Sequence, residues 1–293
     1  MEIIRTVSWM HQAARQFRAE NHVIGMVPTM GALHEGHISL LRRAKSQCSK
    51  VVASIFVNPT QFGPNEDLSK YPRTFESDAA KLEAAGVDIL FAPDAREIYP
   101  PGFTTYVTVE GLSDRLEGRS RPGHFRGVAT VVHKLFAMAQ PHFAFFGRKD
   151  AQQARILQRM LLDLNSDIEL VLCPIVREPD GLALSSRNAY LNPDERSAAV
   201  VLHRALEAVR AQIAHGARDA LALQDAARSV LSQEKLARVD YVEIAGADTF
   251  EPVARIGAMP AYVLLAVFIG KTRLIDNLLI EPVADSSELR CSL

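Results

Sequence analysis

A continuous apolar run from Val51 to Val57 constrains the fold more than any other stretch of this chain. Apart from Ser54, every residue in the run is apolar, and β-branched side chains predominate. A strand without a polar side is buried on both faces, as in a parallel sheet that is covered by helices. Asn58 and Pro59 end the run. The stretch therefore predicts a central strand of an α/β protein.

Shorter apolar runs alternate with helical periodicity through the first part of the chain. We predict further strands at 23–27, 88–91, 104–109, 142–146 and 168–176, and helices at 7–18, 38–48, 74–85, 128–139 and 150–162. Strands that alternate with helices assemble into a parallel sheet. The expected fold class is therefore α/β.

A different pattern begins near the turn Glu178-Pro179-Asp180-Gly181, and we expect two domains, 1–177 and 178–293. Asn192, Pro193 and Glu195 form a typical helix start, with an N-cap side chain, a proline at the first helical position and a glutamate at the third. The rest of this part predicts amphipathic helices at 193–214 and 217–233 and strands at 239–244 and 262–269. That order favours a smaller α+β domain.

Composition excludes several classes of protein. A formal charge of −1 gives no electrostatic reason to expect nucleic acid or an anionic membrane as a partner, and no apolar run reaches the roughly 18 residues of a membrane span. Cys48, Cys173 and Cys291 lack C-x-x-C spacing, so neither a disulfide framework nor a thiolate zinc site is indicated. Residues 1–20 lack the unbroken apolar core of a signal peptide. A cytoplasmic location fits best.

Two histidines three residues apart, His34 and His37, stand where the strand at 23–27 gives way to a helix. A helix N-terminus offers free backbone N–H groups and partial positive charge, and in parallel sheets such termini line the edge where ligands bind. The histidines are therefore candidates for hydrogen bonds to phosphoryl oxygens, although capping or surface histidines would produce the same pattern. Gly31 and Gly36 favour a functional role because they let the backbone approach a ligand closely. A zinc site is less favoured, since H-E-x-x-H is absent.

A second strand-to-helix turn carries Gly147, Arg148, Lys149 and Asp150. Lys149 suits a cation that reaches phosphates at the carboxyl edge of the sheet, whereas Asp150 alone is better explained as a helix cap. Gln153 shares the apolar face of its helix, so we expect it to point inward, where its amide needs a partner such as a ligand.

Other polar clusters have simple structural explanations when each is taken alone. Ser185-Ser186-Arg187 is explained by a solvated loop, and Asn58 and Gln61 are explained as turn formers. The arginine-rich loop around Arg121 lacks the aromatic platform of an RNA-binding surface, so a small anionic substrate explains it more economically.

Two familiar phosphate motifs are absent from the sequence. Gly270-Lys271-Thr272 looks like the end of a P-loop, but Leu265 stands where the first glycine is required. G-x-G-x-x-G does not occur either. Lys271 is therefore expected to be structural.

Several blocks of the sequence together resemble the pantothenate synthetase (pantoate–β-alanine ligase) family of the H-x-G-H nucleotidyltransferase superfamily. They are PTMGALHEGH at 28–37, FVNPTQF at 56–62 with EDLSKYPRT at 66–74, RPGHFRGV at 121–128, FFGRKDAQQ at 145–153 and REPDGLALSSRN at 177–188. H-x-G-H is shared across the superfamily, whereas the FVNPTQF run and the last two blocks are specific to this family.

The resemblance implies a two-step enzymatic reaction. The carboxylate of pantoate would attack the α-phosphorus of ATP to give pantoyl adenylate and pyrophosphate, and the amine of β-alanine would then displace AMP to give pantothenate. Mg²⁺ would accompany ATP. The first domain would be a Rossmann-like nucleotide-binding and catalytic domain with a parallel sheet, the second a smaller lid-like α+β domain, and the assembly a homodimer.

The resemblance also implies roles for individual residues. Those in catalysis would be His34, His37, Lys149 and Arg187, with His37 as the proton donor. Those around ATP would be Met30, His34, His37, Gly147, Arg148, Lys149, Asp150, Val176, Leu184, Ser185, Ser186 and Arg187. Those at pantoate and β-alanine would be Gln61 and Gln153, with Asn58 and Arg121 as neighbours.

The chain departs from the family's pattern at Arg148, where glutamate is common, and at Ala151, where an aromatic is frequent. The metal ligands stay unassigned, with Asp78 and Gln61 as the candidates. Two alternatives stay open at this point. One is another nucleotidyltransferase of the superfamily that acts on a phosphorylated substrate, and the other is a non-catalytic nucleotide-binding module.

Overall fold

The computed structural model describes residues 1–64, 66–284, 286 and 288–293. The chain forms two compact units, one of residues 1–148 and 152–173, the other of residues 149–151 and 174–293. The division expected from the sequence, at residue 177, stays a prediction. In the structure the short segment 149–151 and residues 174–177 go with the second unit.

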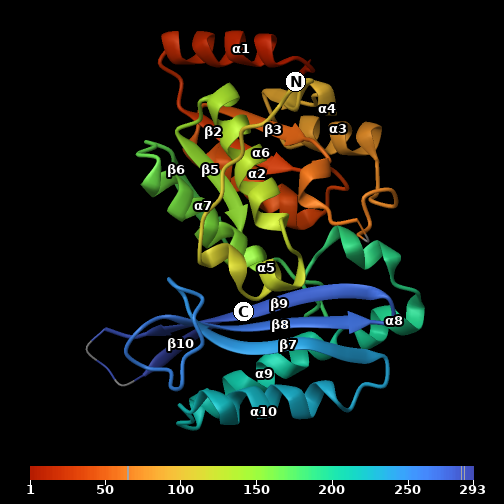
Figure 1. The fold of residues 1–293 in the computed structure, drawn as a ribbon, viewed down its shortest axis with the longest axis vertical. Helices are drawn as coiled ribbons and strands as arrows, with labels where there is room; N and C mark the ends of the chain where they lie inside the picture. Colours follow the sequence, from red (N-terminus) through yellow and green to blue (C-terminus); the bar gives the residue numbers. More distant parts are fainter. Residues whose placement is uncertain (65, 285, 287) are drawn as a thin grey trace. The chain divides into compact units, whose positions relative to one another are not determined.

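The first unit is built on a six-stranded sheet in which every neighbouring pair of strands is parallel (Figure 1). Its strands are β1 (Glu2–Ile4), β2 (Ile24–Thr29), β3 (Lys50–Ile55), β4 (Ile89–Phe91), β5 (Phe143–Gly147) and β6 (Glu169–Cys173), in the order β1-β4-β3-β2-β5-β6. The chain runs outward from β2 to β3 and β4, then returns to β5 on the other side of β2. The sheet therefore has a topological switch point between β2 and β5.

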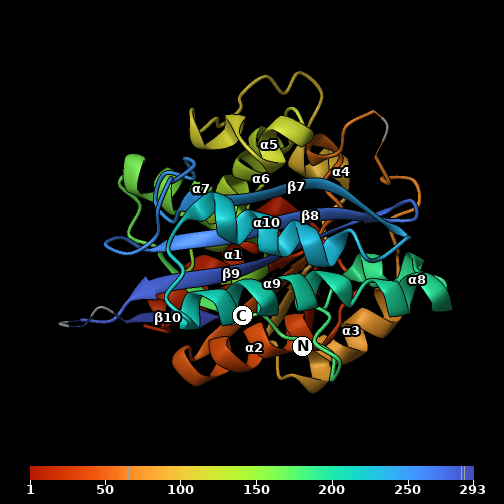
Figure 2. The same cartoon turned by 90° about the horizontal axis from the view of Figure 1, so that it is seen from below.

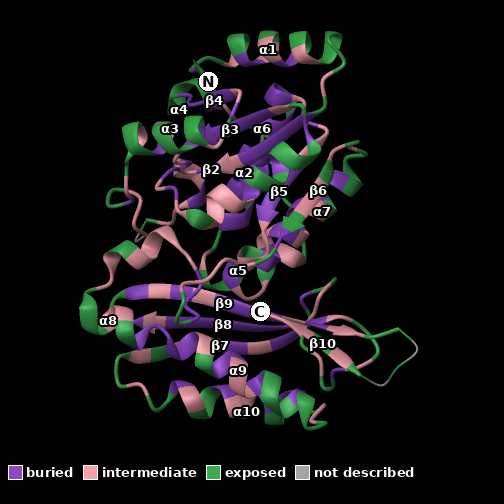
Figure 3. Ribbon diagram, turned by 180° about the vertical axis from the view of Figure 1, so that it is seen from behind, coloured by how far each residue is buried: buried purple, intermediate pink, exposed green. Residues whose placement is uncertain are grey.

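Helices cover both faces of this sheet because successive side chains of a buried strand point to opposite faces. Met26 joins the core that includes helices α6 and α7, whereas its neighbour Val27 joins the core of α2. The helices are α1 (Val7–Ala19), α2 (Glu35–Gln47), α3 (Phe75–Ala84), α4 (Ala95–Ile98), α5 (Glu117–Ser120), α6 (His124–Ala139) and α7 (Ala151–Asp163), with 3₁₀ turns η1 (Pro59–Gln61), η2 (Leu112–Asp114) and η3 (Arg148–Asp150). Buried residues are concentrated in the strands and the inner sides of the helices (Figure 3).

One contact shows how closely α2 approaches the sheet. A Cβ atom added at Gly25 in β2 would lie 2.7 Å from the sulfur of Cys48, which follows α2. A larger residue at this position would force the side chain of Cys48 to shift, so Cys48 is packed against the backbone of a central strand. Its thiol is buried in the core of α2.

The second unit contains an antiparallel sheet in the order β10-β9-β8-β7. Its strands are β7 (Ala237–Gly246), β8 (Ala261–Ile269), β9 (Thr272–Pro282) and β10 (Leu289–Ser292), and its helices are α8 (Pro193–Ala198), α9 (Val201–Ala214) and α10 (Ala220–Leu231), with the 3₁₀ turn η4 (Ser186–Tyr190). Helices α9 and α10 lie along one face of the sheet (Figure 2). They pack on alternate residues of β8, including Val263, Leu265 and Val267.

The predicted fold class is confirmed: a parallel α/β sheet is followed by a smaller α+β part. The expected capping box at Asn192 and Glu195 is present. Gly270 and Lys271 form the tight turn that joins β8 to β9, which agrees with a structural role for Lys271.

Some element predictions were wrong in detail. Residues 104–109 form no strand, because the backbone of Val107 bonds instead to the side chain of Thr130 on α6. The single helix expected at 193–214 is divided into α8 and α9. Strand β2 was expected to end before Pro28 but continues to Thr29. Its pairing with β5 ends at Met26, so the missing N–H of Pro28 costs no hydrogen bond to β5.

Candidate active site

Three adjacent strands of the first unit, β3, β2 and β5, end at the same edge of the sheet. The residues that follow them are Asn58 and Gln61 after β3, Met30 to His37 after β2, and Gly147 with Arg148 at the end of β5. Ligands of open α/β sheets bind at the carboxyl ends of the strands, beside the switch point. The structure therefore brings most first-unit residues predicted for the site to the edge where a ligand is expected.

The segment Met30–His37, here called the histidine turn, leads from β2 into α2. His34 is the N-cap of α2, and its Nδ1 accepts a hydrogen bond from the backbone N–H of Gly36 at 3.2 Å. The Nδ1 of His37 accepts from the backbone N–H of His34 at 3.3 Å. Each neutral ring thus carries its proton on Nε2, and the two ring centres lie 4.2 Å apart. Both imidazoles are oriented by the helix start, so capping and ligand-binding roles are compatible.

Helix α3 holds the backbone of the histidine turn through Asp78, which is fully buried. One carboxylate oxygen accepts from Ala32 N at 2.7 Å, and the other accepts from Leu33 N at 2.9 Å. Lys81 donates to the carbonyl of Leu33 at 2.8 Å and lies 3.9 Å from Asp78. The sequence suggested Asp78 only as a metal ligand, whereas in the structure its oxygens bind backbone donors.

Gln61 lies in η1, and its side chain is held from two directions. Its Oε1 accepts from the side-chain amide of Asn58 at 3.1 Å, and its Nε2 donates to the sulfur of Met30 at 2.8 Å. Asn58 is itself buried and also bonds to Gly127 and to the hydroxyl of Tyr99. Two residues predicted for different substrates, Gln61 and Met30, are thus in direct contact, and Asn58 supports Gln61.

Arg121 is part of a chain of polar contacts that joins the partly buried Glu66 to the buried His124 and the backbone of Gln61. Its guanidinium donates two hydrogen bonds to the carboxylate of Glu66, at 2.8 and 2.7 Å. It also contacts Nε2 of His124 at 3.0 Å, while Nδ1 of His124 donates to the carbonyl of Gln61 at 2.8 Å. Burial opposes ionisation of Glu66, but the bonds and charge of Arg121 hold its pKa below the usual value.

His124 stays neutral in this chain of contacts. Burial and the nearby charge of Arg121 lower its pKa to about 4. Glu66 and His124 were not among the residues predicted for the site. The only signal in the sequence was their place in the blocks EDLSKYPRT and RPGHFRGV.

Helix α7 presents two adjacent glutamines with different environments. Gln153, the residue predicted to meet a ligand, is half-buried. Gln152 is buried and bonds to the carbonyls of Leu112 and Arg115 and to the backbone N–H of Glu117. The more deeply buried amide, that of Gln152, therefore binds the backbone of the segment before α6. Helical periodicity alone did not distinguish Gln152 from Gln153.

In the second unit, the predicted ATP contacts from Val176 to Arg187 belong to one compact turn. Leu184 N donates to the carbonyl of Val176 at 2.9 Å, so these two residues are neighbours. Ser185 caps η4 by accepting from the backbone N–H of Arg187 at 3.3 Å. The cluster that looked like a solvated loop is thus an ordered turn, and Ser186 and Arg187 begin its 3₁₀ helix.

Two adjacent residues of β9 anchor both predicted segments of the second unit. Asp276 is buried and pairs with Arg177 through two hydrogen bonds of 2.7 and 2.9 Å. The side-chain amide of Asn277 donates to the carbonyl of Lys149 at 2.9 Å. One strand thus supports the turn around Val176 and the backbone of Lys149, while Asp150 is exposed. No motif in the sequence pointed to these two residues.

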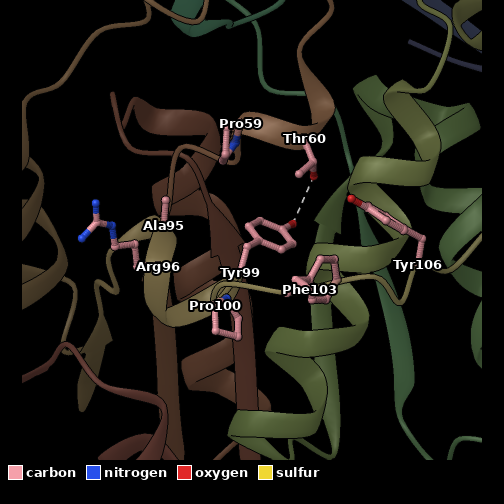
Figure 4. Close-up of a pocket in the computed structure, with 9 residues that line it drawn as sticks. Pro59, Thr60, Ala95, Arg96, Tyr99, Pro100, Phe103 and Tyr106 are labelled. Atoms are coloured by element: carbon pink, nitrogen blue, oxygen red, sulfur yellow. Dashed lines mark hydrogen bonds between the residues drawn. The ribbon is translucent and has the colours of Figure 1, made fainter.

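A shallow pocket of about 350 Å³ is lined in part by Pro59 and Thr60 of η1 (Figure 4). Three aromatic rings line it, those of Tyr99, Phe103 and Tyr106. The hydroxyl of Tyr99 lies 3.1 Å from that of Thr60 and also donates to Asn58. The pocket contains none of the residues predicted for the site, but its wall contacts the Asn58–Gln61 pair.

Neither a cluster of metal ligands nor a membrane-spanning helix occurs in the described part of the chain. Its histidine, cysteine, aspartate and glutamate side chains form no group of three or more arranged to hold a metal ion. None of its helices has the length and apolar character that a bilayer span requires.

The sequence from residue 2 to residue 279 matches the family described as pantoate-beta-alanine ligase. The chain belongs to this family. A pantothenate synthetase of Koribacter versatilis is 53% identical over 292 residues, which cover 100% of both chains. Membership makes the chain a ligase and excludes a non-catalytic nucleotide-binding module.

Solved structures of the pantoate–β-alanine ligase family have the same fold. A pantothenate synthetase from Thermus thermophilus has a TM-score of 0.89 and 46% identity, with 95% of this chain and 99% of that chain covered. A pantoate-beta-alanine ligase from Francisella tularensis, described as complexed with beta-gamma ATP and beta-alanine, has a TM-score of 0.78 and 35% identity over 95% and 97% of the two chains. The architecture described above is therefore that of the family.

Proposed function

We propose that this ligase joins pantoate and β-alanine in an ATP-dependent reaction that passes through pantoyl adenylate. The family supports the ligation itself, and the relative that binds an ATP species together with β-alanine supports ATP as the third substrate. The observation on this chain that carries the proposal is the shared edge of β3, β2 and β5. There Gln61, the histidine turn and Gly147 follow adjacent strands.

The first step would be in-line displacement at the α-phosphorus of ATP. A carboxylate oxygen of pantoate forms the new P–O bond while the bond to pyrophosphate breaks. This step needs positioning and charge neutralisation more than covalent help from the protein. The helix dipole of α2 and the Nε2–H groups of His34 and His37 are suited to phosphoryl oxygens, with His37 as the proton donor. Lys149 and Arg187 would add positive charge.

The second step would be attack of the β-alanine amine on the acyl carbon of the adenylate, with AMP as the leaving group. We assign Gln61 and Gln153 to pantoate, and Asn58 to the support of Gln61. Arg121 already donates two hydrogen bonds to Glu66. Arg121 is therefore assigned as a neighbour of the pantoate-binding glutamines.

The remaining ATP assignments are Met30, Gly147, Arg148, Asp150, Val176, Leu184, Ser185 and Ser186. Mg²⁺ is commonly held by substrate phosphates with only one or two carboxylates, so we write it as a partner of ATP and assign it no residue. The homodimer and the cytoplasmic location stay predictions.

The order of the two steps is tested by omitting each substrate in turn. Pantoate and ATP without β-alanine should exchange labelled pyrophosphate into ATP, because the adenylate forms reversibly. Release of AMP at multiple turnover should require all three substrates. Exchange that depends on β-alanine, or that ignores pantoate, would rule out the adenylate route.

The residue assignments are tested by His37→Ala and Lys149→Ala. Each should lower pantoate-dependent exchange by about 10²–10³, the usual effect of losing one donor to a transition state. Exposed residues of the same type provide matched controls, His133→Ala on α6 and Lys271→Ala in the β8–β9 turn. Near-normal exchange in His37→Ala or Lys149→Ala would contradict the corresponding assignment.

A further inference from the structure

The backbone just before His34 takes a conformation that the chain would not adopt unaided. Gly31 has φ = +85° and Ala32 has φ = +51°, so two consecutive residues are left-handed. Glycine tolerates this conformation, but alanine does so at a cost of about 1 kcal/mol or more. Something outside the turn must therefore hold it in place.

The contacts to helix α3 supply that restraint. Asp78 receives the N–H groups of Ala32 and Leu33, and Lys81 donates to the carbonyl of Leu33. Asp78 also accepts from the hydroxyl of Thr74 at 2.9 Å, which fixes its carboxylate. Three backbone groups next to His34 are thus bound by two side chains one helical turn apart.

The carboxylate is placed for this use and not for catalysis. It is fully buried, it lies in the first turn of α3, where the helix dipole favours a negative charge, and Lys81 lies 3.9 Å away. A Cβ atom added at Gly31 would come within 3.2 Å of Oδ2, so the turn and the carboxylate are in close contact.

We propose that Asp78 is a positioning residue that sets the orientation of His34 and His37 by fixing the left-handed turn before α2. This inference rests on the function proposed above, in which the two imidazoles bind phosphoryl oxygens of ATP. A misplacement of about 1 Å at a reacting group can cost about a hundredfold in rate. Loss of this restraint should therefore reduce turnover without removing any group that touches substrate.

The test is Asp78→Asn, which keeps the shape of the side chain but points an NH₂ group at a backbone N–H. We expect kcat for pantoate-dependent pyrophosphate exchange to fall about tenfold to a hundredfold. The KM for pantoate should stay within about twofold, because Gln61 keeps its hydrogen bond from Asn58, which lies outside the histidine turn. Rates are referred to folded protein, measured by its unfolding transition.

A spectroscopic readout separates positioning from general stability. Histidine ¹⁵N spectra of the native enzyme should show His34 and His37 as Nε2–H tautomers, assigned with His34→Gln and His37→Gln. In Asp78→Asn the signals of these two histidines should shift or broaden, while those of the remaining histidines stay unchanged.

Asp88→Asn is the matched control. Asp88 also accepts a backbone N–H, that of Val51 at 2.8 Å, and pairs with Lys45 and Lys50, but it lies at the amino ends of β3 and β4. This variant should lose stability without changing kcat or the two histidine signals. Equal effects of both variants on kcat, or native histidine signals and native kcat in Asp78→Asn, would overturn the proposal.

If Asp78→Asn does not fold, Lys81→Met provides the test. Lys81 is exposed, and its loss removes one hydrogen bond to the carbonyl of Leu33 and the ion pair with Asp78 while leaving both backbone bonds of Asp78 in place. The same two histidine signals should then shift by a smaller amount, and unchanged signals would again overturn the proposal. Failure of the proposed function is distinguishable from failure of this inference. Normal turnover of His37→Ala would remove the catalytic role of the histidines, while the tautomer spectra would still report whether Asp78 positions them.

Discussion

At the scale of single residues, His124 illustrates how a titratable side chain becomes a fixed structural part. Its two ring nitrogens have opposite tasks, because Nδ1–H donates to the carbonyl of Gln61 and Nε2 faces the guanidinium of Arg121. A proton on Nε2 would point at a positive charge in a buried setting. Burial and Arg121 therefore lower the pKa of His124 to about 4.

This pKa has a consequence for stability. An unfolded histidine titrates near 6.5, so as the pH falls from about 6.5 to about 4 the unfolded chain binds a proton that the folded chain does not. The free energy of unfolding should therefore decrease across this window, by about 3 kcal/mol at most for this group. Above about pH 6.5 His124 contributes no pH dependence.

Urea unfolding at pH 7 and at pH 4.5 checks this prediction. The variant His124→Gln lacks the titrating ring and should lose less stability than the native chain between the two pH values. His133→Gln removes an exposed histidine on the same helix and should behave like the native chain. An identical pH dependence in His124→Gln and the native chain would show that the ring is not the group concerned.

At the scale of elements, the packing of η1 against α6 places Gln61. Gly127 makes this possible, because a Cβ atom there would lie 2.4 Å from the carbonyl oxygen of Thr60 and 2.7 Å from the Cα of Gln61. The amide of Asn58 also bonds to the carbonyl of Gly127. The position of the 3₁₀ turn is thus set by the absence of one side chain.

Gly127→Ala should force η1 away from α6. We expect a loss of about 1–3 kcal/mol in unfolding free energy, the usual cost of overpacking, together with a raised KM for pantoate because Gln61 moves. Gly63→Ala is the control, since a Cβ atom there meets nothing closer than 3.7 Å. An unchanged KM in a folded Gly127→Ala variant would contradict the proposed role of Gln61.

The sequence predicted the elements better than the contacts between them. Strands such as β3 and helices such as α2 are encoded by local apolar periodicity, and the histidine turn follows from their junction. The structural roles of Asp78, Glu66 and Asp276 were not predicted, because each accepts hydrogen bonds from a residue 45 or more positions away in the chain. Local sequence patterns do not predict contacts between residues so far apart in the chain.

The same limit explains the wrong assignment at 104–109. Alternation of side chains predicted a strand, but a strand also needs a neighbouring strand for its backbone hydrogen bonds. The backbone N–H of Val107 instead donates to the hydroxyl of Thr130. Strand β9 was not predicted, although it does have neighbouring strands in the sheet. Its apolar run is interrupted by Asp276 and Asn277, whose polar side chains have partners within the second unit.

At the scale of the whole molecule, the two compact units have separate hydrophobic cores. The core of α9, α10 and the antiparallel sheet is formed by residues from Leu182 onward, while the first unit has a core on each face of its sheet. Each unit therefore has its own free energy of opening, and these values need not be equal.

Because Cys48 is packed against Gly25, alkylation of its thiol should report local unfolding of the first unit. Burial raises the pKa of the Cys48 thiol to about 11, and burial also raises the pKa values of Cys173 and Cys291. Thiolate is the reactive form, so each sulfur should resist an alkylating pulse until its surroundings open. Cys48 and Cys173 report on the first unit and Cys291 on the second.

Peptide mass spectrometry after timed pulses in increasing urea should therefore give two labelling curves. Cys48 and Cys173 should follow one curve, and the half-buried Cys291 should become labelled at lower urea. Labelling of Cys48 in native buffer as fast as that of an unfolded peptide would contradict the close packing at Gly25. The labelling of the three thiols would thus measure local unfolding separately in the two units.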